Sequence, residues 1–187
     1  MMTGEQLRAA AADVVAGTNR AVNFNFFVHQ EPDLARHDPG PMRAALAPYY
    51  SAFGLGEVAA PRAGAPAFGD EILQALLACA PKVVSFHFGL PSAQAIDALK
   101  RAGVKLIGNA TNVAEARVLE AGGMDAIVAQ GAEAGGHRGA FIGAPHENDM
   151  GTMTLVPLVV DAVKIPVIAA GGIFDGRGVA AALMLGA

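Results

Sequence analysis

The sequence of 187 residues has one cysteine, Cys79, and no tryptophan. A single cysteine excludes an internal disulfide and any metal site built from several thiolates. Cys79 lies in the apolar segment 72–80, where a buried, unreactive thiol is the expected role. Any chemistry must therefore come from other side chains.

Charged residues are also scarce, at 16%, and the net charge is −4. No run of Lys or Arg occurs, so the basic surface of a nucleic-acid-binding protein is not expected. No apolar run reaches the roughly 18 residues needed to cross a membrane. The N-terminal residues 1–5 lack the basic start and apolar stretch of a signal peptide. We therefore expect a cytoplasmic protein without a nucleic-acid or membrane partner.

Several familiar catalytic patterns are missing as well. The sequence has no HExxH or other zinc-type histidine spacing, no GxSxG, no P-loop and no GxGxxG. It has no paired carboxylates next to a strand end, which argues against glycoside hydrolysis. No metal site is predicted.

Apolar strand segments alternate with helical segments along most of the chain. Strands are predicted at 21–29, 83–88, 104–108, 126–130 and 166–170, and helices at 5–16, 42–53, 69–79, 92–103, 112–122, 154–163 and from Asp175 onward. This alternation predicts an α/β fold with parallel strands. By itself it leaves two alternatives open, a barrel and an open doubly wound sheet.

Three predicted helices begin at residues that favour capping. Ser92 and Asp175 are good N-caps, because their side chains accept hydrogen bonds from the first free N–H groups. Asn112 is followed three residues later by Glu115, a spacing similar to a capping box.

Polar residues and glycines recur on the strands, mostly near their carboxyl ends. Buried parallel strands are normally apolar, so these exceptions are informative. Strand alternation places each of the following groups on one face or at one strand end: Asn23, Asn25, Phe27 and His29; Ser85 and His87; Asn109; Gln130; Gly171 and Gly172. Such residues also satisfy turn backbone, but their repetition predicts a shared site at the carboxyl edge of the sheet.

The segment 130–139 carries the sharpest signal. Glycines at 135, 136 and 139 permit a close approach of the backbone to an anion or a flavin edge. His137 supplies an acid/base or electrostatic group, and Arg138 supplies a cation.

A second glycine segment ends the strand at 166–170. Gly171 and Gly172, just before the helix capped by Asp175, form a candidate phosphate cradle. A tight turn between strand and helix also requires glycine, so both interpretations stay open.

The segment 130–139 resembles the AQGxEAGGHRG motif of the nitronate monooxygenase family, formerly called 2-nitropropane dioxygenases. Four further segments resemble the family in the same order along the chain: 23–27 (NFNFF), 84–91 (VSFHFGLP), 111–117 and 166–173 (PVIAAGGI). The resemblance implies a TIM (β/α)8-type barrel that binds FMN at its carboxyl face. The whole chain, residues 1–187, is then one partial FMN-binding barrel domain with about strands three to seven of eight.

The resemblance also implies roles for individual residues. His137 matches the catalytic histidine. Asn25, with Asn23 as the alternative, matches the flavin-contacting asparagine; Gln130, Gly135 and Gly136 lie against FMN; and Gly171 and Gly172 hold its phosphate. His87, Ser85 and Arg138 are candidate substrate contacts. The implied activity is oxidation of alkyl nitronates, such as propionate 3-nitronate, with O2 to a carbonyl compound and nitrite.

The sequence departs from the family pattern in several places. The first strand with its Ala-Pro-Met segment, the second strand, and the eighth strand with its Gly-Thr contact have no counterpart, and Val28 and Gly108-Asn109 replace residues common in the family. An open five-strand sheet would expose two long apolar edges. We therefore expect the monomer to bind FMN weakly or not at all, unless a partner, such as a second copy in a homo-oligomer, completes the barrel. The alternatives are a flavin-dependent enoyl-acyl-carrier-protein reductase and an inactive barrel fragment.

Overall fold

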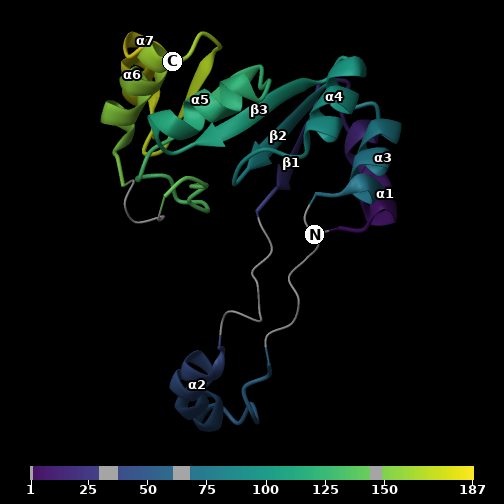
Figure 1. Cartoon of the computed structure of the whole chain (residues 1–187), viewed down its shortest axis with the longest axis vertical. Helices are drawn as coiled ribbons and strands as arrows, with labels where there is room; N and C mark the ends of the chain where they lie inside the picture. Colours follow the sequence, from purple (N-terminus) through teal and green to yellow (C-terminus); the bar gives the residue numbers. More distant parts are fainter. Residues whose placement is uncertain (1, 30–37, 61–67, 144–148) are drawn as a thin grey trace. The chain divides into compact units, whose positions relative to one another are not determined.

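The computed structural model describes residues 2–29, 38–60, 68–143 and 149–187 (Figure 1). The chain divides into two compact units. One comprises Met1 and Gln30–Ala67, and the other comprises Met2–His29 and Phe68–Ala187. The described part of the smaller unit contains helix α2, Gly40–Ala52, whose Arg43 guanidinium donates to the Val58 carbonyl at 2.7 and 2.9 Å. All candidate site residues belong to the larger unit.

The larger unit is a parallel five-stranded sheet in the order β1-β2-β3-β4-β5. The strands are β1 Asn23–Phe27, β2 Val83–His87, β3 Lys105–Ala110, β4 Ala126–Gln130 and β5 Val167–Ala170. The helices are α1 Gly4–Ala16, α3 Asp70–Ala78, α4 Ala93–Arg101, α5 Val113–Ala121, α6 Thr152–Ala162 and α7 Gly176–Met184. Every predicted element is present with small shifts of its ends, and the predicted parallel α/β order is confirmed.

The predicted helix caps are confirmed in two cases and half confirmed in the third. Ser92 Oγ accepts the Ala95 N–H at 3.2 Å, and the Asp175 carboxylate accepts the Arg177 N–H at 2.9 Å. Asn112 Oδ1 accepts the Glu115 N–H at 2.9 Å. The reciprocal bond of a capping box is absent from α5, however, because the Glu115 carboxylate turns toward the Thr111 N–H instead.

The two faces of the sheet differ in burial. The side chains under the helices form the core, and they include Val84, Phe86, Leu106, Ile127, Ala129 and Val167. Helices α4, α5 and α6 contact strands β3 to β5 on this side. The alternate residues, such as Ser85, His87 and Val128, are only half-buried. The polar residues that alternation placed together therefore lie on the less buried face of the sheet.

The two edge strands have different surfaces. Beside β5, an open groove of about 360 Å³ is lined by apolar residues that include Ile168, Val179 and Leu183. On β1, in contrast, Asn23 and Asn25 are exposed. The expected apolar edge is thus present at β5, whereas the exposed amides of β1 lie on one face of that strand, next to Ser85 of β2.

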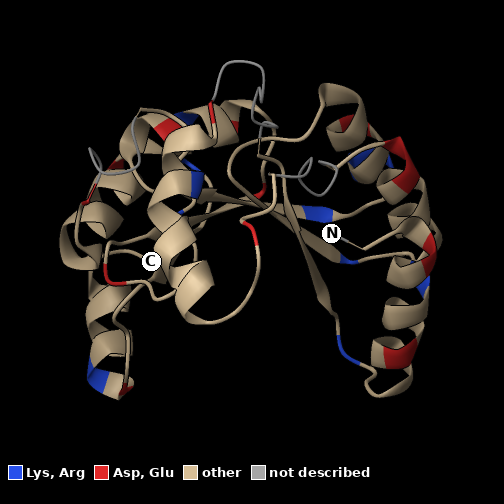
Figure 2. Cartoon of the chain, turned by 90° about the horizontal axis from the view of Figure 1, so that it is seen from below, with Lys and Arg blue, Asp and Glu red and all other residues tan. Residues whose placement is uncertain are grey.

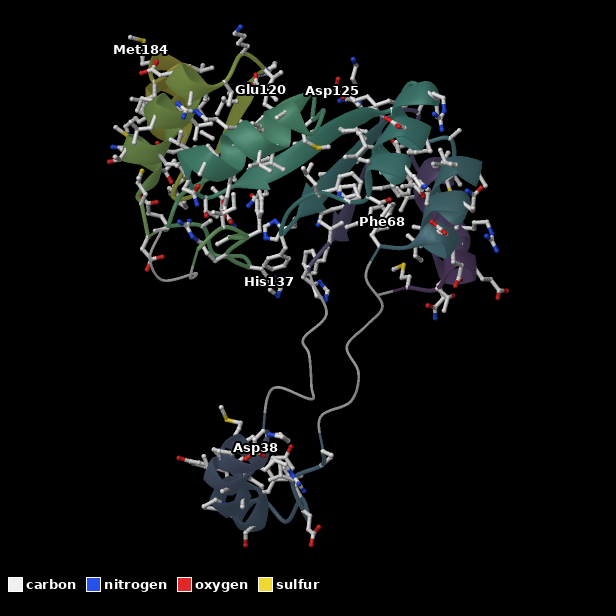
Figure 3. The ribbon with its side chains drawn as sticks, viewed as in Figure 1. Asp38, Phe68, Glu120, Asp125, His137 and Met184 are labelled. Carbon is white, nitrogen blue, oxygen red and sulfur yellow. The ribbon has the colours of Figure 1, made fainter. Side chains whose placement is uncertain are left out.

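Charge is distributed without a single dominant sign. Basic and acidic residues are interspersed along the helices (Figure 2). Asp125, at the amino end of β4, forms ion pairs with Lys100 at 3.0 Å and Lys105 at 3.7 Å. It lies at the amino-terminal ends of the strands, whereas His137 lies at the opposite ends (Figure 3). Within the described ranges, no helix is both long and apolar enough to cross a membrane.

Candidate functional site

The loop that follows β4 is fixed at the main-chain carbonyl of His137. The Nε2 atom of His87, at the end of β2, lies 2.9 Å from this oxygen. The side-chain amide of Gln130, the last residue of β4, donates to the same oxygen at 2.8 Å. Two strands therefore hold one carbonyl, which places the exposed His137 ring beyond the carboxyl ends of the strands (Figure 3).

Gln130 also holds the next residues of the loop. Its Oε1 atom accepts the Gly139 N–H at 2.9 Å and an amide hydrogen of Asn109 at 3.2 Å. The Arg138 guanidinium donates to the Gln130 main-chain carbonyl at 2.7 Å. The predicted flavin contact Gln130 is therefore buried and bonded to its own loop, and Arg138 contributes to the same fold-back.

An aromatic cluster formed by Phe27, His87, Phe88 and His137 surrounds this carbonyl. The ring centroid of His137 lies 5.3 Å from that of Phe27 and 6.3 Å from that of Phe88, and both pairs are edge-to-face. Phe88 packs on His87 at 4.6 Å and on Phe27 at 5.2 Å. Its φ of 70° lies in the left-handed region, which is costly for a residue with a side chain. Such strain concentrates at functional sites, because the surrounding packing must maintain it.

His87 is held as a neutral donor. Burial lowers its pKa from the ordinary histidine value, and this effect outweighs the opposing hydrogen bond to the His137 carbonyl; the charge of His137 lowers the pKa further. Because a carbonyl oxygen only accepts, the proton of neutral His87 must be on Nε2. Its Nδ1 atom is then an acceptor.

A second polar group lies on the same face of β1 and β2. Asn23 Nδ2 donates to Ser85 Oγ at 2.8 Å, and Ser85 Oγ donates to Asn25 Oδ1 at 2.8 Å. The structure thus brings Asn23, Asn25 and Ser85 together, one strand alternation before Phe27 and His87. Both predicted asparagines keep an amide group at the exposed face.

The glycines of the loop fall into two classes when a methyl group is imagined on each. At Gly139 the added carbon would lie 2.3 Å from Asn109 Nδ2 and 2.8 Å from the His87 ring, and at Gly131 it would lie 2.0 Å from Thr152 Oγ1. These two glycines are required by packing. At Gly135 and Gly136 no atom lies within 4 Å, and neither has a left-handed φ. Nothing within the described chain requires glycine at these two positions.

The second glycine segment borders a cavity of about 150 Å³ between the loop that follows β5, α6 and α7. Its lining includes Gly171, Gly172, Glu133 and Thr152. Gly171 has a φ of 122°, and an added carbon there would lie 2.7 Å from Thr152 Oγ1. Packing alone therefore explains Gly171. The Asp175 carboxylate occupies the first N–H groups of α7, so an anion here would depend on the glycine amides.

Glu133 adds a carboxylate to this cavity. It accepts the Thr152 N–H at 2.8 Å and contacts Thr152 Oγ1 at 2.8 Å. Main-chain hydrogen bonds from its own N–H and that of Thr152 lower its pKa. Glu133 therefore ties the loop to the start of α6.

Four residues of the candidate site were not predicted from the sequence in these roles: Phe27 as a ring partner, Phe88, Glu133 and Thr152. Glu133 lies inside the recognised motif and was available as a signal. Phe88 carries no local signal, since its importance comes from an unusual φ and from rings on other elements. Among the described residues, no group of three or more His, Cys, Asp or Glu side chains is arranged to hold a metal ion.

Comparison with known proteins identifies the lineage. The sequence model of the family "Nitronate monooxygenase" matches residues 1–187. The chain belongs to the nitronate monooxygenase family. It is 41% identical over 192 residues to a nitronate monooxygenase of Paraburkholderia phytofirmans, covering 100% of this chain and 51% of the relative. It is 47% identical over 171 residues to a probable nitronate monooxygenase of Staphylococcus aureus, covering 91% of this chain and 48% of the relative.

Solved structures extend the family relationship to the fold. A nitroalkane oxidase from Streptomyces ansochromogenes superimposes with a TM-score of 0.87 and 36% identity, over 99% of this chain and 53% of the oxidase. FabK from Thermotoga maritima gives a TM-score of 0.66 and 30% identity, over 100% of this chain and 45% of FabK. The chain thus spans about half the length of the relatives that it matches. Its sheet is part of a TIM-type barrel, so the alternative of a doubly wound sheet is excluded.

Proposed function

We propose that this chain supplies part of the active site of a flavin-dependent oxidoreductase that oxidises alkyl nitronates with O2 to a carbonyl compound and nitrite. One observation carries the proposal. His87 and Gln130 converge on the main-chain carbonyl of His137, beside a glycine pair with open space around it. Family membership supports the same reaction class.

The residues fit a flavin, and we propose that the flavin is FMN. A planar ring needs backbone that it can approach closely, and Gly135 and Gly136 offer this without being required by packing. Asn23 and Asn25 supply amide groups on the exposed face of the sheet. Gly171 and Gly172 would hold the phosphate through their N–H groups. The bound flavin would accept electrons from the substrate, while the protein positions both.

We propose that His137 is the catalytic residue. Its exposed ring stands between Phe27 and Phe88, and an anionic nitronate placed against it would be oriented and charge-balanced by the imidazole. With a neutral nitroalkane, the same ring would accept the proton lost from carbon. His87, Ser85 and Arg138 are proposed substrate contacts; neutral His87 would present its Nδ1 atom as an acceptor.

The test is an absorption measurement on the purified chain mixed with FMN and then desalted. Because an isolated monomer is expected to bind FMN weakly or not at all, the expected result is flavin bands that are retained at high protein concentration, where a second copy can complete the barrel. Nitrite release should follow when propionate 3-nitronate is added in air. The His137→Asn variant should keep the flavin bands and lose most of the turnover, because the hydrogen bonds at position 137 come from the main chain.

Two results would contradict the proposal. Colourless protein after desalting, at every protein concentration, would show that this chain does not hold FMN. Consumption of NADH with an enoyl thioester, without nitrite release from the nitronate, would point instead to the enoyl-acyl-carrier-protein reductase alternative.

A further inference from the structure

One carboxylate deep in the larger unit lies between the end of β3 and the loop after β4. Glu115, on α5, is 0% exposed. Its Oε2 atom accepts the Thr111 N–H at 2.6 Å and the Thr111 hydroxyl at 2.8 Å. Its Oε1 atom accepts the N–H groups of Phe141 at 2.6 Å and Ile142 at 2.9 Å. Each oxygen thus serves a different segment of the chain.

The bonds to Phe141 and Ile142 fasten the loop that carries His137 at points four and five residues after that histidine. That loop leaves the sheet at Gln130, and these two residues lie outside any helix or strand. Phe141 is half-buried and Ile142 is exposed, and one carboxylate oxygen accepts the N–H groups of both. Between Gln130 and Phe141, the main-chain carbonyl of His137 is held by the side chains of Gln130 and His87.

We propose that Glu115 is a positioning residue that fixes the loop Gly131–Gly143 and thereby the place of His137. Glu115 acts through the backbone of Phe141 and Ile142, whose N–H groups its Oε1 atom accepts. The anchoring of the loop stands on the hydrogen bonds alone. Its importance for catalysis rests on the proposed function of His137.

Because each Glu115 oxygen serves a different segment, substitutions can separate the anchoring of the loop from the contact with Thr111. In Glu115→Gln, the amide oxygen can keep facing Phe141 and Ile142 while the NH2 group turns to the Thr111 hydroxyl, so only the Thr111 N–H loses its acceptor. In Glu115→Met, a side chain of similar length provides neither oxygen. The loop should therefore stay anchored in the Gln variant and be released in the Met variant.

A matched control lies on the same helix. Glu120 also accepts a main-chain N–H from a distant segment, that of Lys164 at 2.6 Å. Glu120 lies at the end of the sheet that is opposite His137 along the strand direction (Figure 3). Glu120→Met therefore removes a main-chain anchor from the same helix, in a more exposed position, without touching the loop.

The experiment measures amide hydrogen exchange and the ring proton signals of His137 by NMR in the 187-residue chain without flavin. In Glu115→Met, the exchange rate of the Phe141 and Ile142 amides should rise at least about ten-fold relative to that of Leu119 in the core. The His137 ring signals should also move toward those of free histidine, because the ring leaves the neighbourhood of Phe27 and Phe88. Glu115→Gln and Glu120→Met should show neither change.

The proposal is overturned if Glu115→Met leaves both readouts unchanged, or if Glu120→Met shifts the His137 signals equally. If Glu115→Met does not fold, the wild-type chain decides. Its Phe141 and Ile142 amides should exchange at least about ten-fold more slowly than those of Gly135 and Gly136 in the same loop, and equal rates would refute the anchor. No readout uses flavin or substrate, so failure of the proposed function would leave these results intact.

Discussion

The substitutions Gly139→Ala and Gly135→Ala should have opposite effects, although both add one methyl group to the same loop. At position 139 the new carbon would lie 2.3 Å from Asn109 Nδ2 and 2.8 Å from the His87 ring. Overpacking of this kind costs about 1–3 kcal/mol. Loss of glycine entropy in the unfolded chain offsets about 0.4–1 kcal/mol of that cost. The central values of these two ranges give a net destabilisation of about 1.3 kcal/mol, which lowers Tm by about 3–5 °C for a chain of this size.

At position 135 no atom lies within 4 Å of the added carbon. Only the entropy effect then remains, and it should raise the free energy of unfolding by about 0.4–1 kcal/mol. Thermal unfolding of the two variants without flavin measures both effects, and desalting with FMN measures flavin retention. Gly135→Ala should lose flavin despite its greater stability, because its methyl group occupies the space proposed for the ring. A Gly139→Ala variant as stable as wild type would refute the packing argument, and unchanged flavin retention in Gly135→Ala would refute the placement of the ring.

Three further perturbations test other parts of the molecule. Because burial lowers the pKa of His87 below its unfolded value of about 6.5, its contribution to stability is complete above that value and is lost below it, as the pH falls through the lower pKa of the folded state. His87→Gln, which keeps a donor for the His137 carbonyl, should flatten this part of the pH–stability curve, and an identical curve would contradict the assignment. Burial would raise the pKa of Asp125, but the hydrogen bond from the Leu106 N–H and the charge of Lys100 outweigh this effect, so the pKa is lowered. Asp125→Asn should therefore lower the free energy of unfolding in urea by about 1 kcal/mol or less at pH 7, and should not change it once acid has protonated the wild-type carboxyl. A loss of stability that persists in acid would exclude a charge effect. Ile127→Ala, in the centre of the core, should cost about 2–5 kcal/mol in the same assay, whereas the exposed Ile168→Ala should cost far less, and equal losses would contradict the assignment of the two faces of the sheet.

The sequence predicts the larger unit well because its signals are local. Strand and helix periodicity, together with capping residues such as Ser92 and Asp175, locate the elements from short stretches of chain. Barrel and open sheet could not be separated in this way, because strand order and closure depend on contacts between distant segments. The family resemblance supplied that choice.

At the candidate site the sequence located the residues but not all of their partners. Gln130, His87 and His137 were identified individually, and the structure joins them through one carbonyl. Glu115 was interpreted as half of a capping box, because the donors that compete for its carboxylate, Phe141 and Ile142, lie 26 and 27 residues away. Long-range hydrogen bonds to main-chain groups leave no periodic trace in a sequence, so this anchor could only be found in three dimensions.

The double hydrogen bond to the His137 carbonyl separates the geometry of the site from its chemistry. Both bonds end on a main-chain atom that every amino acid possesses, so the loop would keep its path whichever side chain stood at position 137. The side chain at position 137 can therefore be exchanged without removing the hydrogen bonds that hold the backbone there. A substitution at position 137 would therefore change the side chain that the loop presents without changing its path, whereas a change of path requires changes at the residues that hold the loop, His87, Gln130 and Glu115.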